Sequence, residues 1–458
     1  MPTVRWVIDT APPRSPLLSR PAHRTLVAGG LAGVAVVAVA LLWWRWGWPL
    51  GIDSAVYRSG ALAVVDGQDL YGRLAATPEW SPDLPFAYPP TAALLFLPLA
   101  VLPAQLAWGA MALSTVAGLV VVVRLVHAHS PSAARSAPPL LLLLALEPVW
   151  RTLGLGQVNV VLMALVFVDV LVLRGSRCGG VLVGLAAAIK LTPLIFVLHL
   201  LVTRRRADAL RALGAFAGLG GVAFAVLPGD TARYWGTAVL GANGAMSNAW
   251  WGNQSLNGLV QRPAGDRLVA TPVLVLLVAA CATAAALLAR AAEQRGDRVG
   301  ALLVTGFCGV LVSPVSWTHH RVWVAPLCVL VAARGRRAVP VVALVVAWSS
   351  GWAFGLVPRG DGREQAWTPL ESLAGNAYVL GALVAGAALA ARSAKRRSGT
   401  GPSAGRSGGG PADRGGGGSC SSADEAPGTA PGARSTWSDR GAATSGAEGE
   451  AGPGVARS

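Results

Sequence analysis

The stretch Trp48-Pro-Leu-Gly-Ile-Asp53-Ser-Ala-Val-Tyr57-Arg58 decides how the chain can fold, because it carries an aspartate out of the first apolar run into a polar loop. That run, residues 26–44, has no charged residue, and at about 1.5 Å per helical residue it can cross a hydrocarbon core about 30 Å thick. Four tryptophans mark the interface at its far end, Trp43, Trp44, Trp46 and Trp48. No small-residue cleavage site follows, so we expect an uncleaved anchor.

The composition indicates an all-α polytopic membrane protein. Of 458 residues, 53% are hydrophobic and 13% are charged, whereas soluble domains carry about 25% charged residues. We expect about 10–12 transmembrane helices. The net charge of +16 comes from arginines in short clusters between the apolar runs, where they act as topology signals, so we expect no nucleic-acid partner. Five scattered cysteines show neither a disulfide framework nor zinc-ligand spacing.

The loop that follows the first run, residues 47–88, should lie outside the membrane. It is rich in acids, which fits an outer location. Residues 54–65 are expected to form an interfacial helix, and Asp53 has two possible roles beside it. It either caps that helix or supplies a reactive carboxylate.

Two segments leave the topology open. Residues 91–123 are interrupted at Pro98 and Pro103, so they form either one span with an interfacial or re-entrant piece, or two spans. Residues 179–202 carry Lys190-Leu-Thr192-Pro193 in their middle and basic clusters on both flanks. We favour a hairpin of two half-helices broken at Pro193, because a straight span would place four arginines outside, Arg124, Arg135, Arg174 and Arg177.

Further apolar runs complete a transmembrane domain over residues 26–391, with a second outer loop at 228–268. Residues 1–25 should form a cytoplasmic N-terminal segment. Residues 392–458 should form a cytoplasmic tail, which is Gly/Ser/Ala/Pro-rich from Ser398 onward and too poor in apolar side chains to order itself.

The topology brings three polar groups to one outer face: Asp53, the run Asn253-Gln254-Ser255-Leu256-Asn257-Gly258, and His319-His320-Arg321. They can therefore contribute to one site. Each also has a structural alternative, since the polar run could be a turn and the histidines could lie at headgroup level.

Lys190 is costly at membrane depth, by about 2.5–3.5 kcal/mol, unless it faces a cavity or a partner. That cost favours a ligand such as phosphate, while snorkelling or pairing with Glu147 remains open. Gln157 and Asn159 are either interhelical hydrogen-bonding groups or substrate contacts. No P-loop or glycine-rich phosphate fingerprint is present, which argues against ATP-driven and nucleotide-sugar chemistry. An aspartate base with a basic group on a phosphate leaving group would need a lipid-borne donor.

Six motifs in consistent order carry a family resemblance. They are Asp53 with Val56-Tyr57 and Asp66 to Gly72, Phe86-Ala-Tyr88-Pro89-Pro90, Gly156-Gln157-Val-Asn159, Lys190-Leu-Thr192-Pro193, Gly252 to Gly258, and Ser313-Pro314-Val-Ser316-Trp317-Thr-His319-His320. Together they resemble glycosyltransferase family 87. Its members are the polyprenyl-phosphate-mannose-dependent α-mannosyltransferases of actinobacteria, with the GT-C membrane fold.

The resemblance implies transfer of mannose, with inversion, from a polyprenyl-phosphate donor to a mannosylated lipid or glycan on the outer face of the plasma membrane. Asp53, His319 or both would act as base, without a metal or cofactor. The residues expected to bind substrate are Tyr57, Arg58, Gln157, Asn159, Lys190, Asn253, Gln254, Asn257, His320 and Arg321. The alternative function is a transporter or flippase of an anionic or lipid-linked substrate that uses the broken helix at Lys190–Pro193.

Overall fold

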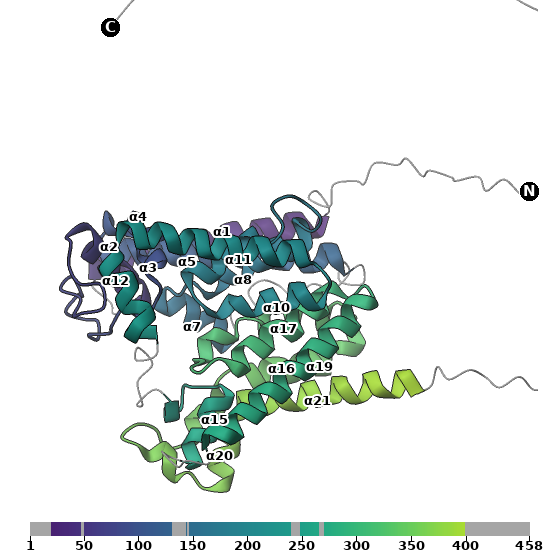
Figure 1. The fold of residues 1–458 in the computed structure, drawn as a ribbon. Coiled ribbons are helices and arrows are strands. Elements are labelled where there is room, and N and C mark those ends of the chain that lie inside the picture. Colours follow the sequence, from purple (N-terminus) through teal and green to yellow (C-terminus); the bar gives the residue numbers. More distant parts are fainter. Residues whose placement is uncertain are drawn as a thin grey trace, which may run out of the picture. The chain divides into compact units, whose positions relative to one another are not determined.

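The computed structural model describes residues 20–46, 50–130, 143, 146–239, 248–264 and 270–398, and within these ranges the regular structure is helical (Figure 1). All of them belong to the first of two compact units, residues 1–401. The expectations for residues 1–19 and for the tail from residue 399 onward lie outside the described residues. The tail predicted from residue 392 begins as helix, because α21 (Ala377–Ser398) continues to Ser398.

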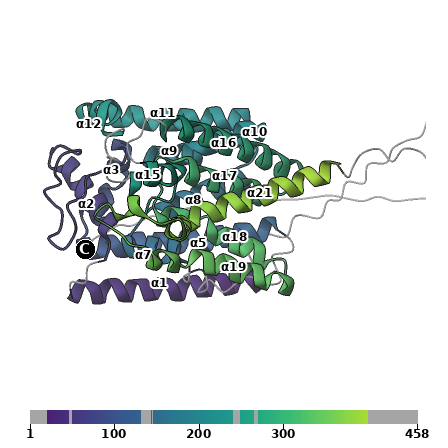
Figure 2. The same cartoon turned by 90° about the horizontal axis from the view of Figure 1, so that it is seen from below.

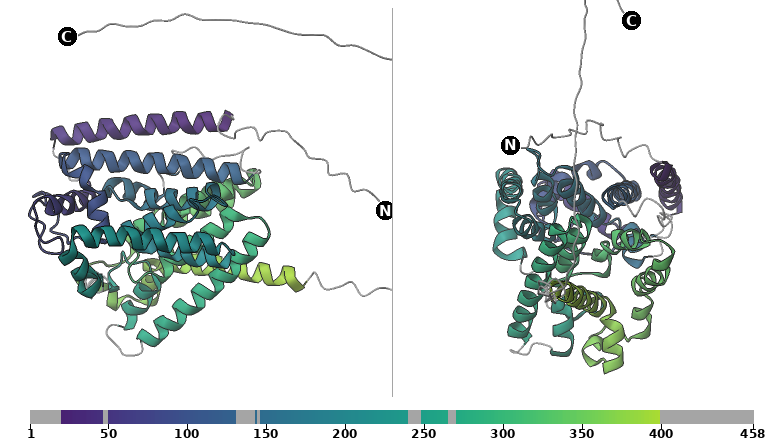
Figure 3. Two further views of the ribbon diagram at one scale, coloured as in Figure 1. Left: turned by 45° about the horizontal axis from the view of Figure 1, so that its top comes forward. Right: turned by 90° about the vertical axis from the view of Figure 1, so that its right-hand side faces the viewer.

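Several described helices are long and apolar enough to cross a membrane. They are α5 (Ala104–His129), α11 (Arg206–Val226), most of α16 (Ala270–Gln294) and most of α21. A bent helix pair would make a fifth span, and shorter apolar helices include α17 (Arg298–Val312). The chain is therefore an all-α polytopic membrane protein, and the count of 10–12 spans stays a prediction. In Figures 2 and 3, α1 (Arg20–Trp46) runs along α5, against which it packs.

The first loop forms the expected helix, α2 (Ile52–Val65), but Asp53 does not cap it. The cap is Gly51, whose φ of 79° suits glycine and whose N–H donates to the Gly154 carbonyl at 2.8 Å. Asp53 lies inside the first turn with no capping hydrogen bond, so the capping role is wrong. This leaves its carboxylate free of the local backbone.

Residues 91–123 contain one long helix. Two short helices, α3 (Pro90–Leu95) and α4 (Leu97–Ala100), precede α5, whose first residue follows Pro103. Proline fits the first turn of a helix and cannot continue one from before it, so each break falls at a proline. Of the two alternatives, the structure has one span preceded by short helices.

A sharp bend separates α7 (Glu147–Leu155) from α8 (Asn159–Phe167), which continues as η3 (Val168–Val172) at 116° to α7. Gly156 makes the turn with φ 68°. A Cβ there would lie 2.6 Å from the Ser54 hydroxyl oxygen, so glycine is required by both backbone and space. The bend thereby brings Gln157 against the start of α2.

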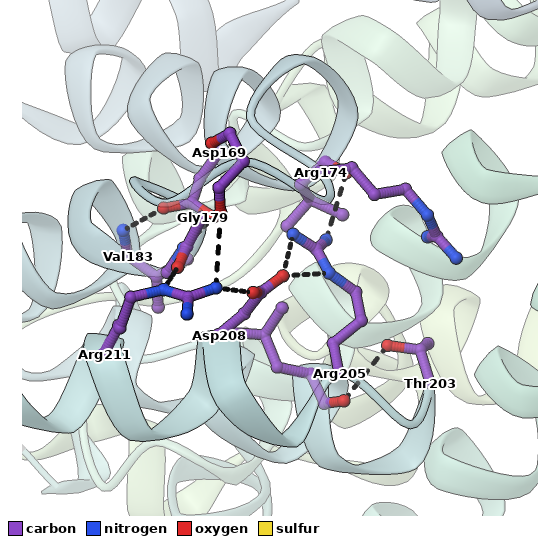
Figure 4. Close-up of polar contacts among 12 residues, drawn as sticks. Asp169, Arg174, Gly179, Val183, Thr203, Arg205, Asp208 and Arg211 are labelled. Atoms are coloured by element: carbon purple, nitrogen blue, oxygen red, sulfur yellow. Dashed lines mark hydrogen bonds and ion pairs between the residues drawn. The ribbon is translucent and has the colours of Figure 1, made fainter.

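Residues 179–202 form the favoured hairpin, with α9 (Val181–Ile189), a 3-10 turn η4 (Thr192–Leu194) and α10 (Ile195–Val202). Both ends of this segment meet at Asp208 of α11, as Figure 4 shows. Arg211, paired with Asp208, also donates to the Gly179 carbonyl at 2.7 Å, while Arg205 pairs with Asp208 from the other end. The segment therefore enters and leaves at the same end of the bundle, and the straight-span alternative is wrong.

Asp169 fixes the first half-helix of this hairpin. Its carboxylate accepts from the N–H groups of Gly180, Leu182 and Val183 at 2.7, 2.8 and 3.1 Å. These are free donors at the start of α9, so the acid serves as a helix cap from a neighbouring segment.

The remaining described elements belong to the long connection at residues 228–268 and to the C-terminal half. They are α12 (Pro228–Arg233), η5 (Tyr234–Ala238), α15 (Leu256–Ala264), η6 (Thr318–Arg321), α18 (Val324–Ala332), η7 (Arg336–Ala338), α19 (Val339–Ser349), η8 (Trp352–Leu356), η9 (Arg363–Ala366) and α20 (Pro369–Gly375). The isolated bridge between Asn253 and Trp317 joins the connection at residues 228–268 to the residue before η6.

Candidate active site

Asp53 presents a carboxylate near the bend between α7 and α8. Burial raises its pKa to about 6, and the charge of Lys190, a hydrogen bond from Gln157 and the charge of Arg151 limit the rise. Among the described residues it forms no ion pair within 4.0 Å. A carboxylate that ionises near neutral pH suits a general base.

Two tyrosines connect Asp53 to the bend. The hydroxyls of Tyr57 and Tyr88 lie 3.1 Å apart, and Gln157 Nε2 donates to the Tyr88 hydroxyl at 3.0 Å. Tyr57 also stacks on Phe96, with ring centroids 4.4 Å apart. The structure thus brings together Asp53, Tyr57 and Gln157, as the sequence predicted.

Arg58 takes a different direction from its neighbour Tyr57. Its Nε donates to the Leu102 carbonyl at 2.6 Å, which joins α2 to the turn before α5. This contact supports the interfacial helix.

Lys190 lies at the break of the hairpin and reaches two other predicted residues. Its Nζ donates to Asn159 Oδ1 at 3.1 Å and lies 3.0 Å from His320 Nε2. It also lies 5.5 Å from the centroid of the Tyr88 ring. None of these partners is negatively charged. The charge of Asp53 acts on Lys190, but the two form no ion pair within 4.0 Å.

Glu147 does not pair with Lys190. Its carboxylate accepts from the Thr318 hydroxyl at 2.6 Å and the Tyr378 hydroxyl at 3.1 Å, and it lies 3.5 Å from Arg151 Nη1. The alternative role of Lys190 as a partner of Glu147 is therefore wrong. Glu147 instead holds η6 through the residue before His319.

The two histidines share a short turn, with ring centroids 4.8 Å apart at 89°. The His319 carbonyl accepts from Thr152 Oγ1 at 3.2 Å and Asn159 Nδ2 at 3.1 Å, so the backbone is fixed. His319 is only 6% exposed, and neither ring nitrogen has a hydrogen-bond partner among the described residues. Burial and the nearby Lys190 charge hold the pKa of both histidines well below the usual range, so both are neutral at neutral pH.

The polar run after Trp251 supports the histidine turn. Asn253 Oδ1 accepts from the Ser316 N–H at 3.0 Å, the Gln254 N–H donates to the Ser316 carbonyl at 2.6 Å, and Asn257 Nδ2 donates to the Pro314 carbonyl at 3.0 Å. All three side chains are buried. The structure places them under the loop that carries η6.

Arg321 also faces the interior. Its guanidinium donates to the Tyr378 carbonyl at 2.7 Å and lies 5.3 Å from the Trp348 ring centroid. Burial lowers its pKa to about 10, which still leaves it charged at neutral pH. The Arg321 side chain therefore points in another direction than those of His319 and His320, although it follows them in sequence.

A cavity of about 50 Å³ is lined in part by Asn159 and His320, the two side chains that contact the Lys190 ammonium. Asn159, Ser316 and His320 line its polar part. The rest is largely apolar, lined by Leu162, Met163, Val166, Ile195, Phe196, Val310 and Trp323 among others. A ligand with an anionic head and a hydrocarbon tail fits this division.

Three contributors were missed as site residues. Tyr88 belongs to the motif Phe86-Ala-Tyr88-Pro89-Pro90, but no feature of the neighbouring sequence indicated a hydrogen-bond partner for its hydroxyl. Glu147 and Arg151 lie four residues apart in a weakly charged region, and that spacing could have indicated a helical pair. In the described part of the chain, no cluster of three or more His, Cys, Asp or Glu side chains could hold a metal ion.

Comparison with known proteins gives the family. The model of glycosyltransferase family 87 matches residues 86–314. A polyprenol-phosphate-mannose-dependent α-(1-2)-phosphatidylinositol mannoside mannosyltransferase from Mycolicibacterium smegmatis is 36% identical, over 72% of this chain and 81% of its own length. The chain belongs to glycosyltransferase family 87. As a family 87 member it is a hexosyltransferase, and the transporter alternative is not supported.

Two further proteins are similar to this family 87 chain. A polyprenol-phosphate-mannose-dependent α-(1-2)-phosphatidylinositol pentamannoside mannosyltransferase from Mycobacterium tuberculosis is 36% identical, over 68% of this chain and 73% of its own length. The crystal structure of ArnT from Cupriavidus metallidurans, bound to undecaprenyl phosphate, is 18% identical over 80% of this chain and 78% of that chain, with a TM-score of 0.40.

Proposed function

We propose that the protein transfers mannose from a polyprenyl-phosphate-mannose donor to a mannosylated phosphatidylinositol acceptor at the outer face of the plasma membrane. The names of the relatives support the donor and the acceptor class. The observation that carries the proposal is the contact of Lys190, which forms no ion pair among the described residues, with Asn159 and His320 in the wall of a largely apolar cavity.

The donor binds with its phosphate at Lys190 and His320 and its isoprenoid chain along the apolar part of the cavity. The Lys190 ammonium donates to His320 Nε2, which places the proton of the neutral imidazole on Nδ1. Lys190 supplies the charge that stabilises the phosphate as it departs. Asn159 orients the ammonium through its carbonyl oxygen.

Transfer proceeds by a single displacement. Asp53 accepts the proton of an acceptor hydroxyl while that oxygen bonds to C1 of mannose. The bond from C1 to the phosphate oxygen breaks, and the phosphate leaves with the electron pair. Attack from the face opposite the phosphate inverts C1.

Asp53 suits the base role better than His319. Its pKa of about 6 makes it ionised at neutral pH and basic enough to accept a proton. His319 has a pKa held well below its usual range, which makes it a weaker base. Its unpartnered ring nitrogens suit hydrogen bonds to sugar hydroxyls.

The distribution of arginines supports the outer location. Arg174, Arg205 and Arg211 gather where both ends of the hairpin meet, at the opposite end of the half-helices from Lys190. Basic residues favour the cytoplasmic side, so the lysine end faces outward.

The test uses purified protein in lipid nanodiscs with radiolabelled polyprenyl phosphate mannose and a phosphatidylinositol mannoside. Wild-type protein should label the glycolipid, and Asp53→Asn should lose about 1,000-fold or more in rate. Asp66→Asn is the matched control, because Asp66 is an exposed acid in the same loop, and it should keep full activity. Label transfer by Asp53→Asn at the wild-type rate would refute the assignment of the base.

A further inference from the structure

A tryptophan with two arginines lies beside the proposed site. The guanidinium carbon of Arg151 is 5.5 Å from the Trp251 ring centroid, and that of Arg359 is 5.0 Å from it. Both distances are within the range of a cation–π contact. Two positive groups are therefore held close together on one aromatic side chain.

Arg151 connects this cluster to the reacting groups. Its charge acts on both Asp53 and His319. The next residue, Thr152, donates to the His319 carbonyl at 3.2 Å. The cluster therefore extends from the surroundings of Asp53 and His319 to Arg359.

The side chains of Arg151 and Trp251 are both held in position by neighbouring side chains. Glu147 holds Arg151 at 3.5 Å, and Trp251 contacts Phe354 at a centroid distance of 5.4 Å. Phe354 in turn packs edge-on against Tyr378 at 4.9 Å. The inner arginine and the indole are thus held in place before any ligand binds.

Arg359 differs from Arg151 in its pairing. It is exposed, and its guanidinium has no carboxylate within ion-pair distance among the described residues. The preceding η8 exposes Trp352 and Leu356 at 60% and 63%. Large apolar side chains beside an arginine suit the level of the lipid headgroups, where phosphodiesters lie.

We propose that Arg151, Trp251 and Arg359 form the binding site for an anionic glycolipid acceptor. Arg359 binds the phosphodiester that joins the glycan to its lipid, the exposed part of Trp251 packs against a sugar ring, and Arg151 orients the sugar that presents its hydroxyl to Asp53. This assignment rests on the proposed function, since it concerns the acceptor of the same transfer. It makes the acceptor's charge, and not only its mannose, a determinant of specificity.

The first test is a binding measurement that does not need turnover. In Asp53→Asn protein in uncharged detergent, retention of radiolabelled phosphatidylinositol dimannoside should weaken about tenfold on adding Arg359→Gln, as expected for one lost charge-assisted contact. Arg337→Gln is the matched control, since Arg337 is also exposed and forms no ion pair among the described residues, but it does not contact Trp251. That control should bind as the parent does.

The second test is kinetic. For otherwise wild-type protein, the ratio of kcat/KM with phosphatidylinositol dimannoside to kcat/KM with neutral octyl α-mannoside should fall about tenfold in Arg359→Gln. The KM for the donor should not move, because the donor phosphate binds at Lys190. An equal loss with both acceptors would overturn the proposal.

Competition separates the glycolipid from bulk lipid. Phosphatidylglycerol shares the phosphodiester but lacks the glycan, so a large excess should displace little dimannoside. Displacement by both lipids at equal concentration would make the surface a membrane anchor and overturn the proposal, as would unchanged dimannoside binding in Arg359→Gln. Dimannoside binding that depends on Arg359, without any mannose transfer from polyprenyl phosphate mannose, would leave this site standing and refute the proposed function.

Discussion

The two ends of the hairpin at residues 179–202 differ in whether their buried charged side chains form ion pairs. At one end Asp208 pairs with Arg205 and Arg211, and Asp169 caps α9 (Figure 4). At the other end Lys190 contacts Asn159, His320 and the Tyr88 ring, and it forms no ion pair within the part of the chain that the structure describes. At the first end the buried carboxylates are paired with arginines or with backbone N–H groups, whereas the second end carries a charge that an anionic ligand can neutralise.

This difference separates structural from functional polar groups. A buried charge that is fully paired contributes to holding helices together, and removing one partner leaves the other exposed to the full desolvation cost. A buried group without a partner lowers the stability of the free protein, and it is kept where a substrate supplies the missing contact. His319, whose ring nitrogens have no partner among the described residues, belongs to the second class. Asp53 and Lys190 have neutral hydrogen-bonding partners and act on each other's charge, but they form no ion pair within 4.0 Å.

The largest expected change in stability concerns the paired end. Asp208→Ala leaves the buried Arg205 without its carboxylate and should cost about 3–5 kcal/mol. We expect a lower thermal denaturation temperature in detergent and a lower yield of folded protein. Glu79→Ala, which removes an exposed acid without an ion pair among the described residues, is the control and should change neither. Equal stability of the two variants would show that the Arg205–Asp208–Arg211 cluster is not structural.

Lys190→Met should act on the reaction and not on folding. It keeps the length of the side chain but removes the charge that faces the donor phosphate, so kcat/KM for the donor should fall about 100- to 1,000-fold. Thermal stability should hold or rise, because a buried charge has been removed. A variant that unfolds like Asp208→Ala would erase the distinction between the two ends.

Asp53→Asn should stabilise the protein at neutral pH. The pKa of Asp53 in the folded protein, about 6, lies above the 3.8 of an ordinary aspartate, so the folded state favours the protonated form. The contribution of Asp53 to the free energy of unfolding therefore declines as pH rises from about 4 to about 6. A neutral amide at this position avoids that loss, which amounts to up to about 3 kcal/mol. Denaturation temperatures of the two proteins should converge below about pH 4. A loss of stability at neutral pH would place Asp53 among the structural groups.

The smallest effect is expected at the bend beside Asp53. Gly156→Ala forces a side chain into φ 68° and against the Ser54 hydroxyl, at a cost of about 1–2 kcal/mol. Transfer should fall about tenfold because Gln157 and Asp53 are displaced. Gly154→Ala is the matched control, since no atom lies within 4 Å of its added Cβ. Equal activity of the two variants would show that the bend does not position the base.

Sequence reasoning located the breaks and the main charges of the site. The proline after Lys190 indicated a broken helix, which the structure has, while the ligand inferred from the cost of Lys190 in the membrane stays a prediction. Basic residues on both flanks of 179–202 favoured the hairpin that the structure has. These arguments worked because desolvation and topology depend on residue type and order.

Sequence reasoning could not assign the directions of side chains. Arg321 follows His320 directly, yet a 3-10 turn sends it into an aromatic cage. The side chains of Asn253 and Asn257 hydrogen-bond to the backbone of residues 314–316, and that of Gln254 donates to the Trp251 and Gly375 carbonyls. These side-chain directions depend on which backbone N–H and C=O groups remain unpaired in the folded chain. A sequence pattern does not reveal which groups those are.

The pH dependence of kcat/KM for wild-type transfer tests the central claim, that Asp53 is a base tuned by burial, most directly. Protonation of Asp53 should reduce the rate about tenfold for each pH unit below about 6, because the base is then occupied. His319 and His320, whose pKa values are held well below the usual range, should add no step there. A rate that stays constant down to about pH 4.5, as an ordinary aspartate would give, would contradict the account.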